Sequence, residues 1–463
     1  RIGYVSQFSQ LDKMKEITVF EYIGEKFIKL QNEITSICSE METSLDIESL
    51  LEKYQQALDA FDAINGDDFE NNINKNLSLA NLIKFKDLMI SELSGGEFKL
   101  IQVIREMLNS PELMIMDEPD VFLDFGNLNS LKDLIISHKG TMLIVTHNRY
   151  LLNHCFNKIL HLENKELQEF DGSYIDYNFS LLQTKIEMQE LAIADDEEFW
   201  RNEMLIKKLR YLATEHTEAA KGKSLNARVK IQERLEKRRI KAPFVDIKEP
   251  NITLVTNNEI EEIIALKVTD YCVSFDDMLL ENVNFEIKST DKVAIVGLNG
   301  TGKTTMLQEI FKNNNDSIEI NEEVEVAYLS QLQGKTLNES NTILEEFIDA
   351  GFKTYEEIKS YVAGYGFEEE IVNQKIVSLS GGEKNMLQLA KISASNANLL
   401  LLDEPTSHLD TYSQIALEKA IKNYKGAILM ISHDFYSIVN CMDFVLIIED
   451  KTIRKMSMRK FRK

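Results

Sequence analysis

The chain has 463 residues, of which 44% are apolar and 28% charged, so it is long and apolar enough to bury the cores of two to three domains. No apolar run approaches the roughly 18–20 residues that span a bilayer, and the sequence predicts no membrane span. Its four cysteines never form a CxxC pair, which excludes a disulfide scaffold and a thiolate zinc site and fits a reducing cytoplasm. The net charge of −24 argues against a generic nucleic-acid coat but leaves a local basic surface open.

An internal repeat organises the chain. Three motifs recur at a shift of 286 residues: LSGGE at 93–97 and 379–383, Asp-Glu-Pro at 117–119 and 403–405, and a histidine after an apolar run at His147 and His433. A fourth motif, Tyr-x-Ser-Gln, recurs at a shift of 324, at 4–7 and 328–331, so the first copy has 38 extra residues between Gln7 and Leu93. Because Arg1 aligns with Glu325, we expect a two-domain protein that is truncated inside its first domain.

The extra residues of the first copy carry two apolar stripes at helical spacing. The stripes are Ile23, Phe27, Leu30, Ile34, Ile37 and Met41, and then Ile47, Leu51, Tyr54, Leu58 and Phe61. Separated by residues 42–46, they predict an antiparallel helical hairpin at about 16–64. An ordinary helical layer of a globular domain is the alternative, but the 38 additional residues favour a projecting arm.

A second helical segment joins the two copies. Residues 178–242 contain no proline and one glycine, which predicts two long helices that turn around residues 218–226. Residues 201–242 carry 13 Lys and Arg against five Asp and Glu. A solvated helix face is one interpretation of this charge, and a phosphate-facing surface is the other. The resulting division is a first domain at 1–177, a linker at 178–250 and a second domain at 251–463.

The second copy opens with a P-loop in its required strand–loop–helix context. An apolar strand at 292–296 runs into the loop and a helix. The loop residues are Gly297, Leu298, Asn299, Gly300, Thr301, Gly302, Lys303, Thr304 and Thr305. Glycines let backbone N–H groups close around the β- and γ-phosphates, the lysine neutralises phosphate charge, and the Thr304 hydroxyl ligates Mg²⁺. A glycine-rich turn without nucleotide is the bland alternative. The first copy has no counterpart of this run, and we expect one complete nucleotide site in this chain.

Polar residues follow the buried strands of the second copy. Asp403 and Glu404 end the apolar run 398–402, where ligands of parallel sheets bind. We expect Asp403 to hold Mg²⁺ through water, and Glu404 to polarise the attacking water. His433 would stabilise the γ-phosphate, and Gln331 offers an amide to Mg²⁺ and the water. A polar loop and a structural histidine are the alternatives, which the P-loop and the duplicate His147 disfavour.

LSGGE is a glycine pair that opens a helix, again suited to bind phosphate through backbone N–H groups. Because its own P-loop lies elsewhere, it must act on a nucleotide held by the other copy. With these motifs in place, the sequence resembles a tandem ATP-binding-cassette (ABC) ATPase. The resemblance implies an α/β fold of two tandem ABC-type P-loop ATPase domains with a helical-hairpin arm and a long helical linker, working as a monomer whose domains pair intramolecularly.

Residue roles follow from the resemblance. It implies catalytic roles for Glu404, His433, Gln331, Glu118 and His147, and Mg²⁺ ligation by Thr304, Gln331, Asp403 and Asp117. It implies ATP binding by the loop 297–305, by the Q-loop residue Gln7 and by the signature residues Ser94, Gly95, Gly96, Glu97, Ser380, Gly381 and Gly382. The base would stack on Phe275, with Tyr271 as the alternative.

The residues also narrow the family. Asp403-Glu-Pro-Thr-Ser-His-Leu-Asp410 is close to the sequence typical of the ABC-F group, and the arm and charged linker match insertions of that group. The segment Phe170-Asp-Gly-Ser-Tyr174-Ile-Asp-Tyr177 is similar to the one that leads into its linker. The resemblance implies a cytoplasmic protein without membrane or DNA partners that binds the ribosomal E site, with linker and arm reaching 23S rRNA and P-site tRNA. In the first copy Glu118-Pro-Asp-Val-Phe-Leu-Asp124 departs from this pattern.

Antibiotic resistance by ribosomal protection is the function we expect, because the divergent first copy suggests a specialised member. A housekeeping translation factor is the alternative within the group. A motor subunit of a membrane transporter, and a DNA-repair or chromosome ATPase, are alternatives outside it. The transporter leaves the arm and basic linker unexplained, and the repair ATPases carry longer coiled coils or zinc modules.

Overall fold

The computed structural model of the protein describes residues 2–6, 15–42, 47–121, 123–163, 165–178, 199, 201–207, 228–234, 250–256, 262–274, 278–330 and 336–462. The chain divides into two compact units, which are residues 1–155 with 249–463, and residues 156–248. The first unit contains both cassettes, and the second contains a β-hairpin and helical segments of the linker.

The second cassette is built on a six-stranded sheet in the order β10-β11-β12-β8-β13-β14, parallel except for its last strand, β14. A three-stranded antiparallel sheet, β7-β6-β9, accompanies it. The strands are β6 (Ile264–Ser274), β7 (Met278–Lys288), β8 (Lys292–Val296), β9 (Ile318–Ile320), β10 (Val326–Leu329), β11 (Leu399–Asp403), β12 (Ala427–Ile431), β13 (Phe444–Glu449) and β14 (Thr452–Ser457). The helices are α9 (Lys303–Lys312), α10 (Ile343–Asp349), α11 (Tyr355–Ala363), α12 (Gly381–Ala394), α13 (Thr411–Asn423), α14 (Phe435–Cys441) and α15 (Met458–Phe461).

Alternation along the strands builds two cores on opposite faces of the large sheet. Leu400 and Leu402 of β11 belong to the core shared with helices α10–α14, whereas Leu399 and Leu401 belong to the core shared with α9, β6 and β7. Successive side chains of a strand point to opposite faces, so a strand covered on both sides must be apolar throughout. The sequence of β11, LLLLD, meets this requirement, because its one acid, Asp403, is the last residue of the strand.

The first cassette repeats part of this design in a three-stranded parallel sheet, β1-β2-β3. Its elements are β1 (Ile2–Val5), α3 (Phe69–Leu79), α4 (Gly95–Leu108), β2 (Leu113–Asp117), α5 (Phe125–Ser137), β3 (Thr141–Val145) and α6 (Arg149–His154). Tyr4 pairs with Ile115 and Tyr328 with Leu401, so partners 111 residues apart in the first copy correspond to partners 73 apart in the second, a difference of 38. The equal registers confirm the duplication and the length of the insertion.

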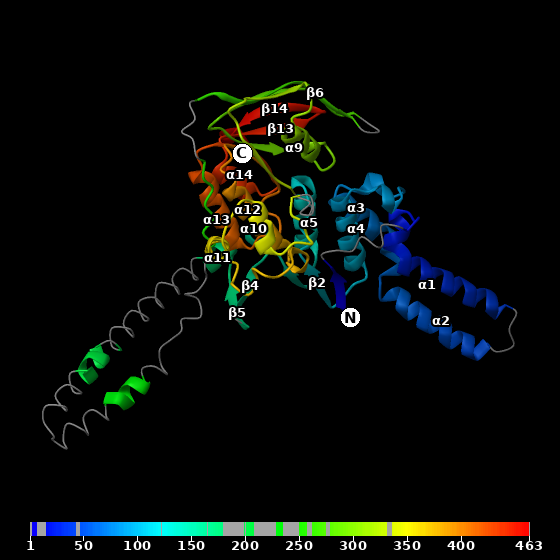
Figure 1. Ribbon diagram of the computed structural model, residues 1–463. Helices are drawn as coiled ribbons and strands as arrows, with labels where there is room; N and C mark the ends of the chain where they lie inside the picture. The colour runs from blue at the N-terminus through cyan, green and yellow to red at the C-terminus, as the bar shows by residue number, and fades with distance from the viewer. Residues whose placement is uncertain are drawn as a thin grey trace, which may run out of the picture. The chain divides into compact units, whose positions relative to one another are not determined.

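The insertion forms the arm, a hairpin of two helices, α1 (Val19–Met41) and α2 (Ile47–Asp62), which lie side by side (Figure 1). Phe27 anchors its base, with its ring stacked on Phe69 at 5.0 Å and tilted against Phe61 at 5.6 Å. The predicted stripe of the second helix is wrong in part. Tyr54 packs in the seam as predicted, but Leu51 is 54% exposed, and the seam contains Leu50 and Ala57, each one position before a predicted residue.

The second unit contains an antiparallel hairpin of β4 (Lys158–Glu163) and β5 (Glu166–Asp171). Tyr177 packs on this hairpin. Its hydroxyl lies 2.5 Å from His161 Nδ1, and its ring makes an edge contact with Phe170, which explains the aromatic spacing of residues 170–177. In the linker, residues 201–207 and 228–234 are helical. Asn202 donates to the Arg228 carbonyl and to the Gln232 amide oxygen, so the two pieces pair as the hairpin prediction requires. The predicted turn at 218–226 lies outside the described residues.

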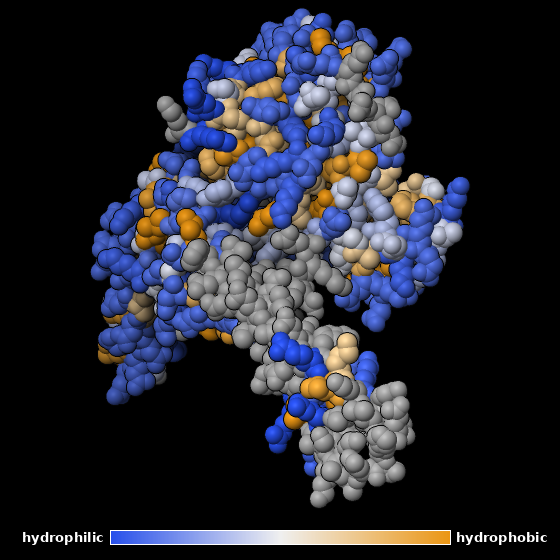
Figure 2. Space-filling model, turned by 90° about the vertical axis from the view of Figure 1, so that its left-hand side faces the viewer, coloured by the Kyte–Doolittle hydropathy of each residue, from blue (hydrophilic) through white to orange (hydrophobic). Residues whose placement is uncertain are grey.

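The surface of the protein is predominantly hydrophilic on the face drawn in Figure 2, with smaller hydrophobic areas among the charged side chains. In the part of the chain that the structure describes, no helix combines the length and apolar character needed to cross a membrane.

Candidate functional site

The P-loop of the second cassette connects β8 to α9 through a turn that only glycine adopts easily. Gly300 and Gly302 have φ angles of +79° and +89°, and an added Cβ at Gly300 would meet no atom within 4 Å. The loop therefore leaves open space beside exposed backbone, at the N-terminus of α9. Lys303 is buried and donates from Nζ to the carbonyls of Gly297 and Leu298, each at 2.7 Å.

Asp403 lies at the carboxyl end of β11, where the sheet delivers it to the P-loop. Its side chain is fully buried, with Oδ1 3.3 Å from the Thr304 hydroxyl and Oδ2 3.3 Å from the Tyr328 hydroxyl. Burial raises the pKa of Asp403, and its hydroxyl partners and the Lys303 ammonium oppose that shift. The result is a pair of oxygen donors, a carboxylate and a hydroxyl, that converge beside the loop.

Glu404 follows directly and turns its carboxylate toward the same place. Its φ of +52° is strained for a residue with a Cβ, and the backbone is held by a hydrogen bond from Glu404 N to Ile431 O at 2.9 Å. Burial, together with the Asp403 carboxylate, raises the pKa of Glu404 to about 8. Glu404 Oε1 is buried without a hydrogen-bond partner among the described residues.

His433 faces this carboxylate from the end of β12. Its backbone N–H donates to Glu404 Oε2 at 3.3 Å, and its Nε2 lies 3.5 Å from Glu404 Oε1. Burial and the Lys303 ammonium lower the pKa of His433 to about 4, so the ring is neutral near pH 7. The pair combines a carboxyl group, one oxygen of which has no hydrogen-bond partner among the described residues, with a neutral imidazole, the residue types that orient a water.

The signature motif of the first cassette lies across the same cavity. Ser94 caps α4 by accepting from Glu97 N, and the Glu97 carboxylate accepts in turn from Ser94 N. This capping box leaves Gly95 and Gly96 at the start of the helix. Ser94, Gly95 and Gly96 line a cavity of roughly 630 Å³ together with P-loop residues and with Asp403, Glu404 and His433. The second signature has the same capping box but does not line this cavity. There, Gly382 packs against the His408 backbone.

The acids of the first cassette share the geometry of the second. Glu118 has a φ of +42° and donates from its backbone N to Val145 O at 2.8 Å, as Glu404 does to Ile431. Its carboxylate lies 3.9 Å from both His147 Nε2 and His408 Nδ1, and Glu118 and His147 line the cavity as well. Asp117 ends β2 as Asp403 ends β11.

Three predicted site residues, Gln7, Gln331 and Phe275, lie outside the described residues. The alternative for stacking the base is wrong in this structure. Tyr271 has no exposed surface and its ring belongs to the core between β6, β7 and the large sheet, because its position on β6 faces inward.

Two residues of the first cassette reach the second and were missed from sequence. Asp124 accepts from Asn299 N in the P-loop at 3.1 Å while it caps α5 through Asn127 N at 2.8 Å. The repeat could have identified Asp124, because Asp410 is the corresponding residue of the second copy, 286 residues further along the chain. Arg149 forms ion pairs with Glu418 and Asp434, and no motif marked it.

The donor set fits a magnesium nucleotide. Hard divalent cations take oxygen ligands, and Mg²⁺ is commonly held by one or two protein groups plus phosphates. In the described residues no group of three or more His, Cys, Asp or Glu side chains could hold a metal by itself. The Thr304 hydroxyl and the Asp403 carboxylate lie beside a glycine loop with open space. They match a site in which Mg²⁺ is held partly by the protein and partly by phosphates.

Comparisons with known proteins agree with this geometry. The profile of the family described as "ABC transporter" matches residues 1–121 and 280–407, more than half of the chain. The "Uncharacterized ABC transporter ATP-binding protein YfmM" of Bacillus subtilis is 29% identical over 449 residues, which are 94% of this chain and 84% of that protein. "ABC transporter F family member 2" of Arabidopsis thaliana is 29% identical over 92% of this chain, which spans 62% of that relative.

A solved structure shares the tandem fold. Archaeal ribosome recycling factor aABCE1, in its complex with ribosomal stalk protein aP1, matches 99% of this chain and 86% of its own with a TM-score of 0.57. Its sequence is 18% identical, so the likeness shows the fold alone. Family profile, F-family relatives and tandem fold agree: the chain belongs to the ABC transporter family of ATP-binding-cassette ATPases and, within it, to the ABC-F group.

Proposed function

We propose that the chain hydrolyses ATP at a composite site formed by the P-loop of the second cassette and the signature motif of the first. The observation that carries this proposal is the single cavity lined by Ser94–Gly96 and by the P-loop, Asp403, Glu404 and His433. Two sets of backbone N–H groups face one space, which suits a triphosphate held from both ends.

Each residue has a role that its surroundings support. Lys303 neutralises phosphate charge, and Thr304 and Asp403 hold Mg²⁺, with Gln331 as a further ligand implied by its motif. Mg²⁺ bound there supplies positive charge to the phosphates and favours the ionised form of the neighbouring Glu404. Glu404 Oε1, buried and unpartnered among the described side chains, then accepts from the attacking water, and neutral His433 keeps the carboxylate oriented.

Replacement of Glu404 tests these roles. Glu404→Gln keeps the size of the side chain but removes its charge and proton-accepting capacity, so phosphate release should fall by about 10²-fold or more. ATP affinity should stay within about threefold of wild type, because the variant leaves the P-loop intact. Glu322→Gln is the control, since Glu322 is an exposed glutamate of the second cassette that does not line the cavity, and it should retain activity. Wild-type turnover by Glu404→Gln would reject the assignment.

We further propose that the protein acts on the ribosome. Membership of the F group supports this proposal, and two solved structures with the same tandem fold are of a ribosome recycling factor and of ribosome-bound ABCE1. The four free cysteines suit a reducing cytoplasm. We place the contact with 23S rRNA and P-site tRNA at the E site in the linker 178–250, with the arm as a second contact.

Local charge is the main support for the linker. Its 13 basic and five acidic residues between 201 and 242 stand in a chain of net charge −24. If six or so of these residues contact phosphate, the log of the affinity should fall with the log of salt at a slope of about −4 to −5. A solvated helix face would leave ribosome binding insensitive to these residues.

A charge reversal separates the two interpretations. Lys221, Lys223 and Lys230 should be changed to Glu together, whereas Arg228 is kept because it contacts Asn202 in the helix pair. The control reverses three exposed lysines of the second cassette: Lys312, Lys353 and Lys425. Sedimentation with ribosomes at two salt concentrations should show loss for the linker variant alone, with ATP affinity unchanged in both. Equal pelleting of wild type and linker variant would remove the linker from the mechanism.

Ribosomal protection against antibiotics is the finer proposal, and a housekeeping translation factor is its alternative within the group. The divergent stretch from Glu118 to Asp124 supports a specialised member. Drug susceptibility of a sensitive bacterium that expresses the protein decides between them, since only protection raises inhibitory concentrations. Recovery of the protein with membrane helices of a partner would instead favour the transporter alternative.

A further inference from the structure

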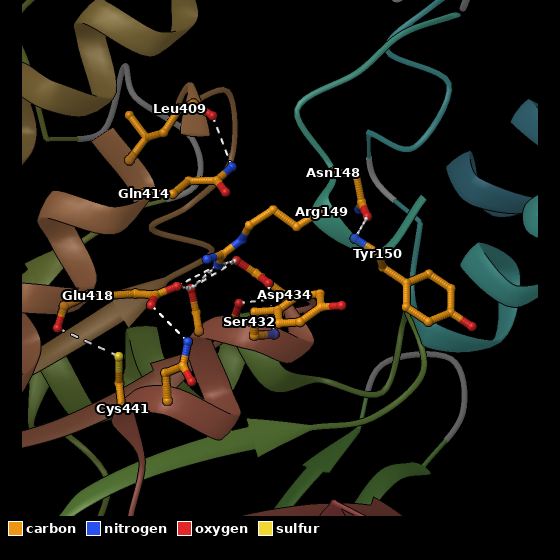
Figure 3. Close-up of polar contacts among 12 residues, drawn as sticks. Asn148, Arg149, Tyr150, Leu409, Gln414, Glu418, Ser432, Asp434 and Cys441 are labelled. Carbon is orange, nitrogen blue, oxygen red and sulfur yellow. Dashed lines mark hydrogen bonds and ion pairs between the residues drawn. The ribbon is translucent and has the colours of Figure 1, made fainter. Parts of the chain in front are cut away.

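A buried charge cluster joins the first cassette to the helix that follows His433. Arg149, the first residue of α6, donates from Nη2 to Glu418 Oε1 at 2.5 Å and to Asp434 Oδ2 at 2.7 Å (Figure 3). The Arg149 side chain is 10% exposed, Glu418 8% and Asp434 18%. Such a cluster differs from a surface ion pair, because loss of one partner leaves uncompensated buried charge.

Asp434 connects this cluster to the site. It is the residue after His433, and its Oδ1 caps α14 by accepting from Tyr436 N at 3.0 Å. Its backbone N–H donates to Ser432 Oγ, the side chain on the other side of His433, also at 3.0 Å. The turn that carries His433 is thus fixed at both ends, and one of these ends is held by a side chain of the other cassette.

Glu418 completes the hold from the neighbouring helix α13. It accepts from Ser437 Oγ at 3.2 Å and from Asn440 Nδ2 at 3.0 Å, both on α14. Arg149 therefore contacts two acids of the second cassette that α14 also holds. Its guanidinium also lies over the Tyr436 ring, 5.3 Å from the centroid.

The cluster exists on one side of the repeat only. A shift of 286 residues places Phe435 at the position of Arg149, Lys132 at that of Glu418 and Asn148 at that of Asp434. The second copy thus has no cation to offer, and the first copy has no acids to receive one. A general structural brace between two similar cassettes would be expected on both sides, whereas this contact is made to the turn that carries His433 and not to the turn that carries His147.

We propose that Arg149 is a positioning residue for ATP hydrolysis: it holds Asp434, and through it His433, in register with Glu404 when the two cassettes are engaged. This inference rests on the proposed hydrolysis at the composite site. Arg149 acts through the turn that carries His433 and does not contact the nucleotide. Its removal therefore affects the chemical step and leaves ATP binding to the P-loop intact.

Kinetics of the full chain test the inference. Arg149→Ala should lower kcat by about 10- to 100-fold, the range expected for a buried charged hydrogen bond, with the KM for ATP within about threefold of wild type. Arg149→Lys, which reaches one carboxylate at a time, should recover part of the loss. Rates are normalised to ATP-binding sites counted by equilibrium binding, so that misfolded protein does not contribute.

Two variants separate positioning from stability. Asn153→Ala is the matched control, since Asn153 lies one turn along α6 and donates to Tyr436 OH at 2.8 Å without charge. It should keep kcat within about twofold. Arg149→Met combined with Glu418→Gln relieves the acidic repulsion but leaves Asp434 with its partners on α14 alone, Ser437 Oγ and Tyr436 N, and without the hold from the first cassette, so its kcat should remain low.

Three results would overturn the inference: wild-type kcat in Arg149→Ala, recovery of kcat in the neutral double variant, or a rise of KM that accounts for the whole loss. These results differ from a failure of the proposed function. If Glu404→Gln hydrolyses ATP as fast as wild type, the composite site itself is wrong, whatever Arg149 does.

Discussion

The contact between Asp124 and the P-loop makes a quantitative prediction. One oxygen of Asp124 caps α5 and the other accepts from Asn299 N, and the residue is only 5% exposed, so water cannot replace either partner. Loss of an N-cap costs about 1 kcal/mol, and a hydrogen bond to a charged group about 1.5–3 kcal/mol. The free energy of unfolding of Asp124→Ala should therefore be lower than that of the wild type by about 2–4 kcal/mol, and the larger part of this difference comes from the contact with Asn299.

The repeat supplies the control. Asp410, which corresponds to Asp124, caps α13 through Ser413 N at 2.7 Å. Asp410→Ala should lose the cap alone. If the contact with Asn299 contributes its 1.5–3 kcal/mol to closure of the composite site, kcat/KM for ATP should fall about 10- to 150-fold in Asp124→Ala, at about 1.4 kcal/mol per tenfold. Asp410→Ala should stay within about twofold of wild type.

Asp124→Asn sharpens the test. Its amide oxygen can keep the cap on Asn127, but its NH₂ group then faces the N–H of Asn299, donor against donor. Thermal stability should fall less than in Asp124→Ala, because the cap is kept, while kcat/KM falls as it does in Asp124→Ala. The assays are phosphate release across an ATP titration and a thermal scan of each variant. Equal losses of activity in Asp124→Ala and Asp410→Ala would refute the reasoning, since the cap would then explain both.

Three further predictions concern other parts of the chain. Equilibrium titration should find tight ATP binding at the P-loop of the second cassette that Lys303→Ala abolishes; unchanged binding in Lys303→Ala would contradict the assignment of the P-loop. Burial raises the pKa of the Cys441 thiol to about 12, so at pH 8 iodoacetamide should modify exposed Cys38 and leave Cys441 unmodified in the folded protein, as peptide mass spectrometry can show. Phe27→Ala should destabilise the arm by about 3–5 kcal/mol and expose it to proteolysis while ATP hydrolysis persists.

Much of the fold could be predicted because the sequence contains an internal repeat, so each motif of one cassette could be checked against its copy in the other. The repeat has two shifts, 324 residues at Tyr4 and 286 residues at Ile115, and together they predict that Tyr4 and Ile115 pair in the same way as Tyr328 and Leu401. The motif residues mark the ends of strands and the starts of helices. Asp403, Glu404 and His433 could be grouped for the same reason, since parallel strands deliver their carboxyl ends to one edge.

What sequence missed depends on packing between distant parts. Leu50 and Leu51 are equally apolar, and only the seam against α1 decides which is buried. Tyr271 was a candidate for base stacking until the inward face of β6 placed it in a core. Arg149 departs from the repeat, and a departure has no partner in the sequence to identify it. Its acids lie 269 and 285 residues further along the chain.

The arm begins where the second cassette also has a helix. Thr18 and Glu21 form a capping box at the start of α1, Thr342 and Glu345 form one at the start of α10, and each threonine makes the same bridge, to Met89 and to Lys375. The 23 residues of α1 thus extend an element of seven residues that the fold already contains. At 1.5 Å per residue this gives a rod of about 35 Å whose length can change by whole turns while both anchoring points stay in place. The distance that the arm reaches from the first cassette therefore depends on the length of its helices, which can vary independently of the chemistry at the cavity.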